Sequence, residues 1–315
     1  MENSKDFSVF AGSSHPELGK GVAAFLGKPL DKITLKTFSS GEKYVALEEE
    51  VRGKNVFLIQ TCRDQGVNED YVELFLMADA AKQAYAESVC AVIPYFGYSR
   101  QDKIHGKREA ISAKVMAKLL VASGVKHVVT FQLHSDQIQG FFDVPVDHLK
   151  VHDLFAEHLK KKKVKNWVVV STDAGGVKNA KELANLLGAE IAVLHKHRPE
   201  HNQSEVTHVI GDVKGKTCII YDDIIDTAGS VCNAQKAILA EGANPQVYLC
   251  ATHAIFSGPA IERLKKAKFE EVVVTDTLPL GPKKQLKRLK QISIASVLSK
   301  KILKITQQKS VSNLG

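Results

Sequence analysis

The chain has 315 residues, of which 44% are hydrophobic and 25% charged, and this balance excludes a disordered, collagen-like or coiled-coil protein. Lysine and arginine outnumber aspartate and glutamate by 43 to 35, so the net charge is +8 and anionic partners such as phosphorylated metabolites are favoured. No apolar run approaches the ~18 residues of a membrane span, and the polar N-terminus lacks a secretion signal. The 5 cysteines form no CxxC pair, which indicates buried thiols, so we expect a cytoplasmic protein with no membrane partner.

Short runs rich in valine and isoleucine alternate with helical patterns along the chain. In the first half the predicted strands are Ser8–Ala11, Asn55–Gln60, Ser88–Ile93 and His127–Thr130, and the predicted helices are Pro16–Phe25, Tyr71–Ala84 and Ile111–Ala122. In the second half the predicted strands are Trp167–Ser171, Glu190–Leu194, Thr217–Tyr221, Gln246–Ala251 and Glu271–Thr275, and the predicted helices are Val177–Leu187 and Val231–Glu241. Nearly continuous hydrophobicity is typical of parallel strands that are covered on both faces. We expect Gln291–Lys304 to add a strand and a helix to one of the sheets.

This strand and helix alternation occurs once on either side of residue 150, and Val144–Lys150 is the best boundary. The sequence therefore predicts an α/β fold with two similar doubly wound parallel-sheet domains, residues 1–149 and 150–315. Lysine clusters at Lys160–Lys163 and Lys283–Lys290 have no aromatic residues between the lysines. We interpret both as solvated surface and expect no nucleic-acid partner.

The most informative segment is Thr217–Ser230, in which a buried strand ends at Tyr221 and a helix begins near Val231. Between them lie two adjacent carboxylates, Asp222 and Asp223, and a short loop with the sequence Asp-Thr-Ala-Gly-Ser. Ligands of open α/β sheets bind at the carboxyl ends of the strands, and a helix N-terminus offers free N–H groups to a phosphate. The hydroxyl groups of a sugar are suited to donate hydrogen bonds to the two carboxylates. The segment therefore predicts a sugar-phosphate site. The alternative is an ordinary strand–turn–helix with Asp226 as N-cap, which would have a similar sequence pattern.

Asp222–Ser230 resembles the ribose-5-phosphate loop of proteins that bind phosphoribosyl diphosphate, which have domains of the phosphoribosyltransferase type. Further blocks narrow the resemblance to the ribose-phosphate diphosphokinases, over nearly the whole chain from Phe7 to Leu314. These blocks are Phe38–Glu42, Pro94–Asp102, Ile111–Ala113, His134, Asp136–Asp143, Lys196–Pro199 and Thr252–Pro259. Members of this family transfer the β,γ-diphosphoryl group of ATP to the C1 hydroxyl of ribose 5-phosphate and release AMP.

The resemblance implies a role for each matching residue. The residues that would hold ribose 5-phosphate are Asp222, Asp223, Asp226, Thr227, Ala228, Gly229 and Ser230. Lys196 and Arg198 match the catalytic cations of a flexible loop, where positive charge stabilises the transferring oxygens. ATP would be bound by Arg100 and Gln101, and by Phe38, Ser40 and Glu42 of a neighbouring subunit. His134 and Asp173 match positions associated with Mg²⁺. Self-association to dimers and hexamers is implied as well.

Two positions depart from the family pattern, because Ser40 and Gln132 each stand where aspartate is usual. They motivate an alternative hypothesis, a catalytically silent regulatory paralogue, although the catalytic and sugar-phosphate loops are retained. A phosphoribosyltransferase would share Asp222–Ser230 but would not explain Arg100, Gln101 or Lys196.

Overall fold

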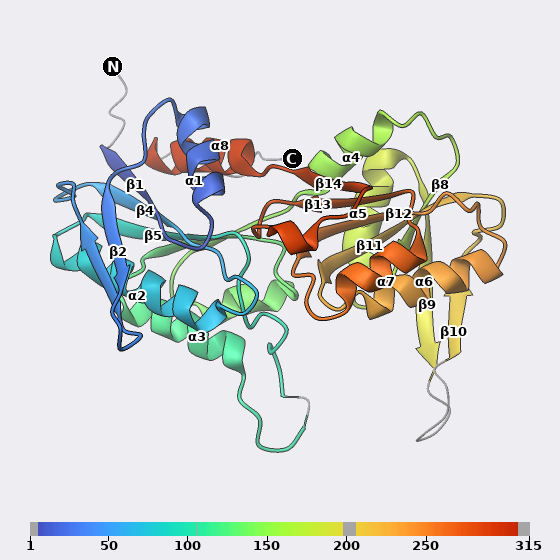
Figure 1. Cartoon of the computed structure of the whole chain (residues 1–315), viewed down its shortest axis with the longest axis horizontal. Coiled ribbons are helices and arrows are strands. Elements are labelled where there is room, and N and C mark those ends of the chain that lie inside the picture. The colour runs from blue at the N-terminus through green and yellow to red at the C-terminus, as the bar shows by residue number, and fades with distance from the viewer. Residues whose placement is uncertain (1–5, 105, 198–205, 308–315) are drawn as a thin grey trace. The chain divides into compact units, whose positions relative to one another are not determined.

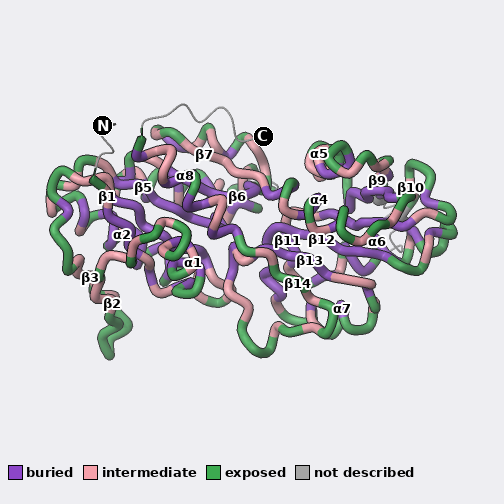
Figure 2. The backbone as a smooth tube through the Cα atoms, turned by 90° about the horizontal axis from the view of Figure 1, so that it is seen from above, coloured by how far each residue is buried: buried purple, intermediate pink, exposed green. Residues whose placement is uncertain are grey.

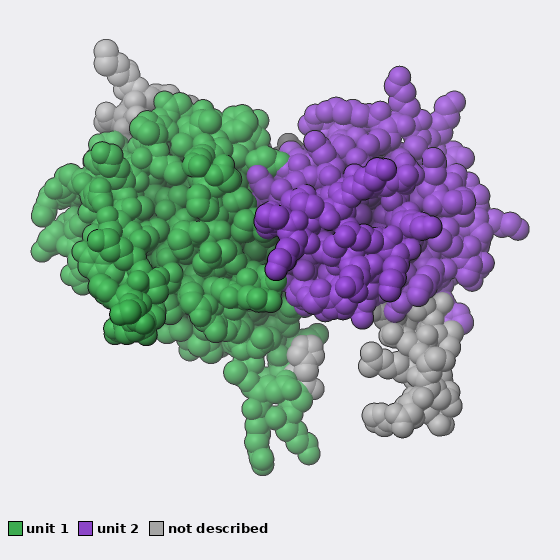
Figure 3. Space-filling view, in the orientation of Figure 1, with its two compact units in different colours: residues 1–149, 277–279, 293–315 green, residues 150–276, 280–292 purple. Residues whose placement is uncertain are grey.

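The structure, a computed structural model, describes residues 6–104, 106–197 and 206–307, and only the backbone of residues 196, 197, 206 and 207. The chain forms two compact units (Figure 3). Unit 1 consists of residues 1–149, 277–279 and 293–315, and unit 2 of residues 150–276 and 280–292. In both units the interior strands are largely buried, and exposed residues lie mainly on helices, loops and outlying strands (Figure 2).

Unit 1 is built on a five-stranded parallel sheet in the order β1-β4-β5-β6-β7. Its strands are β1 (Phe7–Ala11), β4 (Asn55–Ile59), β5 (Ser88–Ile93), β6 (His127–Phe131) and β7 (Val146–Leu149). Helices α1 (Pro16–Leu26) and α8 (Ala295–Thr306) lie on one side of the sheet, and α2 (Val67–Gln83) and α3 (Ser112–Ala122) on the other (Figure 1). A 3₁₀ helix, η1 (Asp136–Phe141), precedes β7, and an antiparallel hairpin of β2 (Ile33–Thr37) and β3 (Lys43–Leu47) contacts α2.

Unit 2 contains a seven-stranded sheet in the order β10-β9-β8-β11-β12-β13-β14, parallel except for β10. Its strands are β8 (Trp167–Ser171), β9 (Glu190–His197), β10 (Val206–Ile210), β11 (Thr217–Ile225), β12 (Tyr248–Ala254), β13 (Glu271–Thr275) and β14 (Leu289–Ile292). Helices α4 (His152–Lys160) and α5 (Val177–Leu187) cover one face, and α6 (Gly229–Ala240) and α7 (Ala260–Ala267) the other; a 3₁₀ turn, η2 (Pro282–Lys284), precedes β14 (Figure 1). The buried core on this sheet includes Val168, Cys218, Ile220 and Val274.

The order of the strands in unit 2 reverses between β8 and β11. The chain moves from β8 outward to β9, whereas from β11 it moves in the opposite direction through β12 to β13. Right-handed crossovers in opposite directions place their helices on opposite faces of the sheet, so the loops after β8 and β11 diverge at the carboxyl ends of these strands. This topological switch point is where ligands of open α/β sheets bind.

The C-terminal segment differs from the expected division into 1–149 and 150–315, because residues 277–279 and 293–315 belong to unit 1. Helix α8 packs on α1, where the Ser299 hydroxyl donates to the Val22 carbonyl over 3.1 Å. The buried ammonium of Lys301 lies 2.7 Å from the Asp147 carboxylate. The expected strand and helix near Gln291–Lys304 are present as β14 and α8, but they belong to different units.

Candidate active site

The predicted sugar-phosphate residues lie at the switch point of unit 2. We had expected Asp222 and Asp223 to follow the strand. Instead β11 runs on to Ile225, so both residues are part of it. Beyond Tyr221, β11 has lost its partner β8 but still pairs with β12. The Thr172 hydroxyl, which follows β8, donates to the Asp222 carboxylate over 3.0 Å. The loop after β8 is thereby joined to the last part of β11.

The two adjacent carboxylates are electrostatically strained. Burial raises the pKa of Asp222 well above its usual value, and the charge of Asp223 raises it further; the hydrogen bond from Thr172 acts in the opposite direction. The Asp223 N–H donates to the Asp222 carboxylate over 2.9 Å. Hydrogen-bond donors or a cation placed here would stabilise the ionised pair, which suits sugar hydroxyls and a divalent metal.

The short loop before α6 has the form of an anion site. Ala228 is the N-cap, with the left-handed backbone angles φ 60° and ψ 13°, and α6 begins at Gly229, not near Val231. No side chain caps this helix end. The first N–H groups of a helix have no partner within the helix, and its dipole is positive there. Ala228, Gly229 and Ser230 therefore present backbone donors to an anion.

Two residues that we had not assigned a role hold this loop from the side of α7. The Ser257 hydroxyl donates a short hydrogen bond to the Asp226 carboxylate, and the Ser257 N–H donates to the Asp226 carbonyl over 3.0 Å. The Arg263 guanidinium donates to the Thr227 carbonyl over 3.0 Å. No local sequence pattern identifies these partners, because they lie 31 and 36 residues away in the chain.

Asp173 lies in the exposed loop between β8 and α5, near the carboxylates of β11. Its carboxylate accepts from the Gly176 N–H over 2.9 Å, and its charge contributes to the raised pKa of Asp222. Within residues 6–104, 106–197 and 206–307, no three histidine, cysteine, aspartate or glutamate side chains form a group able to hold a metal ion by themselves. Any divalent cation at these carboxylates would therefore need ligands from a substrate or water as well.

In unit 1 the predicted ATP and metal residues follow neighbouring strands. Arg100 and Gln101 follow β5 and are exposed, and the Gln101 amide oxygen accepts from the Ser112 hydroxyl over 2.6 Å. His134 is exposed after β6, the strand paired with β5. Both loops therefore leave the same edge of the sheet. An open pocket of about 430 Å³ is lined by Gln101, Lys103, Glu109, Ala110 and Ser112.

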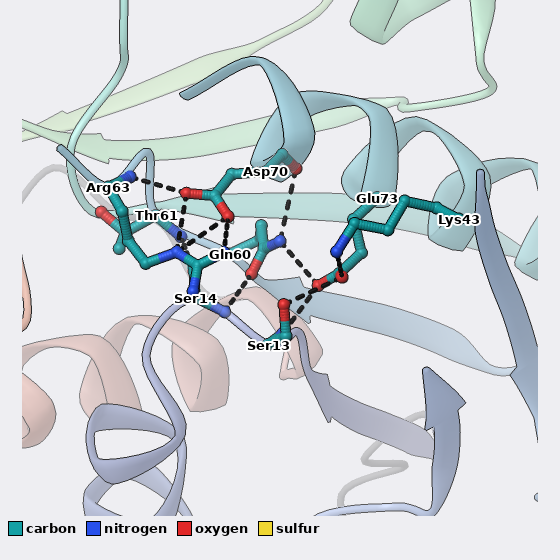
Figure 4. Close-up of polar contacts among 8 residues, drawn as sticks. All are labelled: Ser13, Ser14, Lys43, Gln60, Thr61, Arg63, Asp70 and Glu73. Carbon is teal, nitrogen blue, oxygen red and sulfur yellow. Dashed lines mark hydrogen bonds and ion pairs between the residues drawn. The ribbon is translucent and has the colours of Figure 1, made fainter. Parts of the chain in front are cut away.

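The expected adenine-binding residues lie at the tip of the β2–β3 hairpin. Phe38 is 52% exposed and packs edge-on against Tyr44, and the Ser40 hydroxyl donates to the Glu42 carboxylate over 2.7 Å. Next to the turn, where β3 begins, the Lys43 ammonium lies 3.2 Å from the buried Glu73 carboxylate of α2. Figure 4 shows that Glu73 is part of a polar cluster of Ser13, Ser14, Lys43, Gln60, Thr61, Arg63, Asp70 and Glu73. This cluster joins the hairpin to the loops after β1 and β4.

The two cations that we expect to be catalytic are only partly described. Strand β9 extends to His197, beyond the expected end at Leu194, and the backbone of Lys196 pairs with that of Thr207 in β10. Lys196 therefore lies in an antiparallel strand and not in a loop. Arg198 lies outside the described residues.

Comparison with known proteins explains why these elements occur together. The profile of the N-terminal domain of ribose phosphate pyrophosphokinase matches residues 7–124, and that of the phosphoribosyl synthetase-associated domain matches residues 201–315. A ribose-phosphate pyrophosphokinase of Fusobacterium nucleatum subsp. nucleatum is 45% identical, over 100% of this chain and 99% of that protein. This chain belongs to the ribose-phosphate pyrophosphokinase family. The Bacillus subtilis enzyme of the family is 43% identical, over 98% of this chain and 97% of that protein.

A solved structure of the family leads to the same result. The crystal structure of phosphoribosylpyrophosphate synthetase from Mycobacterium smegmatis has a TM-score of 0.91 and 39% sequence identity, and the match covers 96% of this chain and 100% of that one. The predicted family, the α/β fold and the activity of a ribose-phosphate diphosphokinase are therefore confirmed, and these relatives give no support to a silent paralogue. No helix in the described part of the chain is long and apolar enough to cross a membrane.

Proposed function

We propose that this chain transfers the β,γ-diphosphoryl group of ATP to the C1 hydroxyl of ribose 5-phosphate, giving phosphoribosyl diphosphate and AMP, with the sugar phosphate bound by unit 2 and ATP by unit 1. The main support is the switch point of unit 2, where two carboxylates and an uncapped helix N-terminus occur together. A sugar phosphate has hydroxyl groups, which donate to carboxylates, and a phosphate, which accepts from the N–H groups of a helix N-terminus.

Each end of ribose 5-phosphate has a binding group in this proposal. Asp226, Thr227, Ala228, Gly229 and Ser230 bind the 5-phosphate through backbone N–H groups and hydroxyls. Asp222 and Asp223 accept hydrogen bonds from the ribose hydroxyls. This is supported by the raised pKa of Asp222, which burial and the nearby charge of Asp223 cause, because donors there relieve the repulsion.

In the diphosphoryl transfer, the protein supplies positioning and positive charge. Arg100 and Gln101 bind the phosphates of ATP, and the guanidinium of Arg100 suits two phosphate oxygens at once. Lys196 and Arg198 stabilise the charge that develops on the transferring group and on the leaving AMP. Removing one such preorganised donor costs about 3 kcal/mol, or ~100-fold in rate.

We assign Mg²⁺ as the metal. Asp173 in unit 2 and His134 in unit 1 are the residues that we propose for contacts with Mg²⁺, each together with phosphate oxygens and water. The carboxylate of Asp173 fits the preference of Mg²⁺ for oxygen ligands, and its charge acts on the nearby Asp222, whose pKa it raises. His134 offers a nitrogen, so it would act through a water molecule or as a donor to phosphate. When bound, the ion would neutralise charge on the phosphates of ATP.

The exposed hairpin supports a role in assembly. Phe38, Ser40 and Glu42 reach the adenine of a neighbouring subunit in dimers and hexamers of the chain, so the site is complete only in the oligomer. A 52% exposed phenylalanine on a projecting hairpin agrees with such a contact. The 5 cysteines are buried and unpaired, which agrees with a reducing cytoplasm.

The test is a product assay with the purified full chain, Mg²⁺, ATP and ribose 5-phosphate, in which the nucleotides are separated. We expect one AMP for each phosphoribosyl diphosphate, and a loss of about 100-fold in the Lys196→Ala variant. Lys214→Ala removes an exposed lysine of the same unit and serves as the matched control. Formation of ADP, or full activity in Lys196→Ala, would contradict the mechanism.

A further inference from the structure

We propose that Arg263 is a positioning residue of the phosphate loop, and that it holds Ala228 in the left-handed conformation which the 5-phosphate requires. This inference rests on the proposed binding of ribose 5-phosphate at residues 226–230. Its basis is the contact between α7 and the loop, in which the Arg263 guanidinium donates to the Thr227 carbonyl over 3.0 Å.

The backbone at Ala228 needs such support. With φ at 60°, Ala228 adopts a conformation that only a few per cent of residues other than glycine adopt. Alanine has no side-chain polar group that could stabilise this state locally, and α6 has no side-chain cap. A loop that is free to relax would therefore leave the left-handed state most of the time, and its affinity for the phosphate would fall in proportion.

The contact with Arg263 acts on the peptide group next to Ala228. The Thr227 carbonyl and the Ala228 N–H belong to one planar trans peptide, so they point in opposite directions. When the carbonyl is bound by Arg263, the Ala228 N–H must point away from α7. The orientation of this donor is thereby set before a ligand arrives. Because α6 fixes the chain that follows, the φ angle of Ala228 is constrained as well.

The space beside Gly229 shows how closely Arg263 packs on the loop. A Cβ atom at Gly229 would lie 3.3 Å from the Arg263 guanidinium nitrogen, which is a tight contact. A side chain at position 229 would therefore force the guanidinium to shift by a few tenths of an ångström. The glycine at this position lets the arginine approach the backbone.

A second explanation is that Arg263 acts only through its charge, by attracting the phosphate. The two explanations differ in how they depend on residue 228. Glycine adopts left-handed angles about as readily as right-handed ones, so Ala228→Gly raises the fraction of competent loop when the arginine is absent. A purely electrostatic attraction does not depend on the residue at position 228.

The experiment measures binding of ribose 5-phosphate to the full chain by calorimetry without ATP. We expect Arg263→Ala to weaken binding about tenfold, as for loss of one charged hydrogen bond. In the Ala228→Gly background, Arg263→Ala should lower the affinity for ribose 5-phosphate only about twofold. Lys265→Gln removes a charge from the same helix without touching the loop and should change the affinity less than twofold.

The outcomes are distinguishable. A loss that is as large with glycine as with alanine at position 228, or full affinity in Arg263→Ala, overturns the positioning role. If the wild-type chain itself fails to bind ribose 5-phosphate, the proposed sugar-phosphate site is wrong as well. Because Arg263 is exposed, Arg263→Ala should unfold at the same temperature as the wild type, and a large drop in that temperature would instead assign Arg263 a structural role.

Discussion

Replacing Glu73 by glutamine tests whether the polar cluster of unit 1 stabilises the hairpin that projects Phe38. One carboxylate oxygen of Glu73 accepts from the Ser13 N–H over 2.7 Å and from the Gln60 amide over 2.9 Å. The other accepts from the Ser13 hydroxyl over 2.9 Å and from the Lys43 ammonium over 3.2 Å. All four of these partners act as donors toward one nearly buried carboxylate.

Glutamine can satisfy only one side of this arrangement. If its oxygen faces the Ser13 N–H and Gln60, its NH₂ group faces the Lys43 ammonium, and that contact is lost. A hydrogen bond to a charged group contributes about 1.5–3 kcal/mol, and the remaining bonds each weaken by roughly 0.5–1 kcal/mol when the acceptor becomes neutral. We therefore expect Glu73→Gln to lower the free energy of unfolding of unit 1 by about 3 kcal/mol, or Tm by about 6–12 °C.

The assay is urea unfolding of the full chain at several pH values. Burial alone would raise the pKa of Glu73, but the hydrogen bonds from Ser13 and Lys43 hold it below its usual value. This stabilisation is therefore complete at neutral pH and is lost as the pH falls through the folded-state pKa, so wild type and variant should converge in acid. In a Lys43→Met background the contact with the Lys43 ammonium is already absent, so Glu73→Gln should lower the free energy of unfolding by less than it does in the wild type. A loss below about 1 kcal/mol at pH 7 would refute this reasoning.

Two further predictions concern buried titratable groups. Burial lowers the pKa of His152 to about 4, and its ring lies 2.9 Å from the Tyr221 hydroxyl. As the pH falls, the unfolded chain, in which histidine has a pKa of about 6.5, is protonated before the folded one. Unit 2 should therefore lose about 2 kcal/mol of stability between pH 7 and pH 5. His152→Gln lacks the titrating imidazole, so the urea midpoint of this variant should depend less on pH. An unchanged dependence would show that His152 is not its cause. Lys301 of α8 is 1% exposed and lies 2.7 Å from Asp147; Lys301→Met leaves the carboxylate without this partner and should cost about 3 kcal/mol. Hydrogen exchange should become faster in unit 1 but not in unit 2, and equal acceleration in both units would argue against α8 belonging to unit 1.

The strands that the sequence predicts are those in the interior of the two sheets. Strands such as β4 and β8 are buried on both faces and read as continuous hydrophobic runs. The strands that were not predicted are β2, β3, β7 and β10, and the described side chains in them are mostly half-buried or exposed. Their hydrophobic pattern is therefore weak, and pairing with a neighbouring strand decides their conformation.

The assignment of the C-terminal helix could not be predicted for a different reason. The apolar pattern of α8 shows that the helix needs a partner, but not which one. The partner is decided by contacts between distant segments, such as Ser299 with Val22 and Lys301 with Asp147. Local sequence contains no information on which of two similar sheets a helix will cover.

The same division between local and distant information holds at the phosphate loop. Residue types alone predict Asp222–Ser230, because carboxylates and small residues between a strand and a helix are a local pattern. The conformation of the loop is not local, since alanine disfavours the φ of 60° that Ala228 adopts. The contacts of Ser257 with Asp226 and of Arg263 with Thr227 support that conformation, and they exist only because β11 and β12 are neighbours in the sheet. The order of the strands thus determines the shape of the loop, and a sequence change in α7 should alter phosphate binding without touching the loop itself.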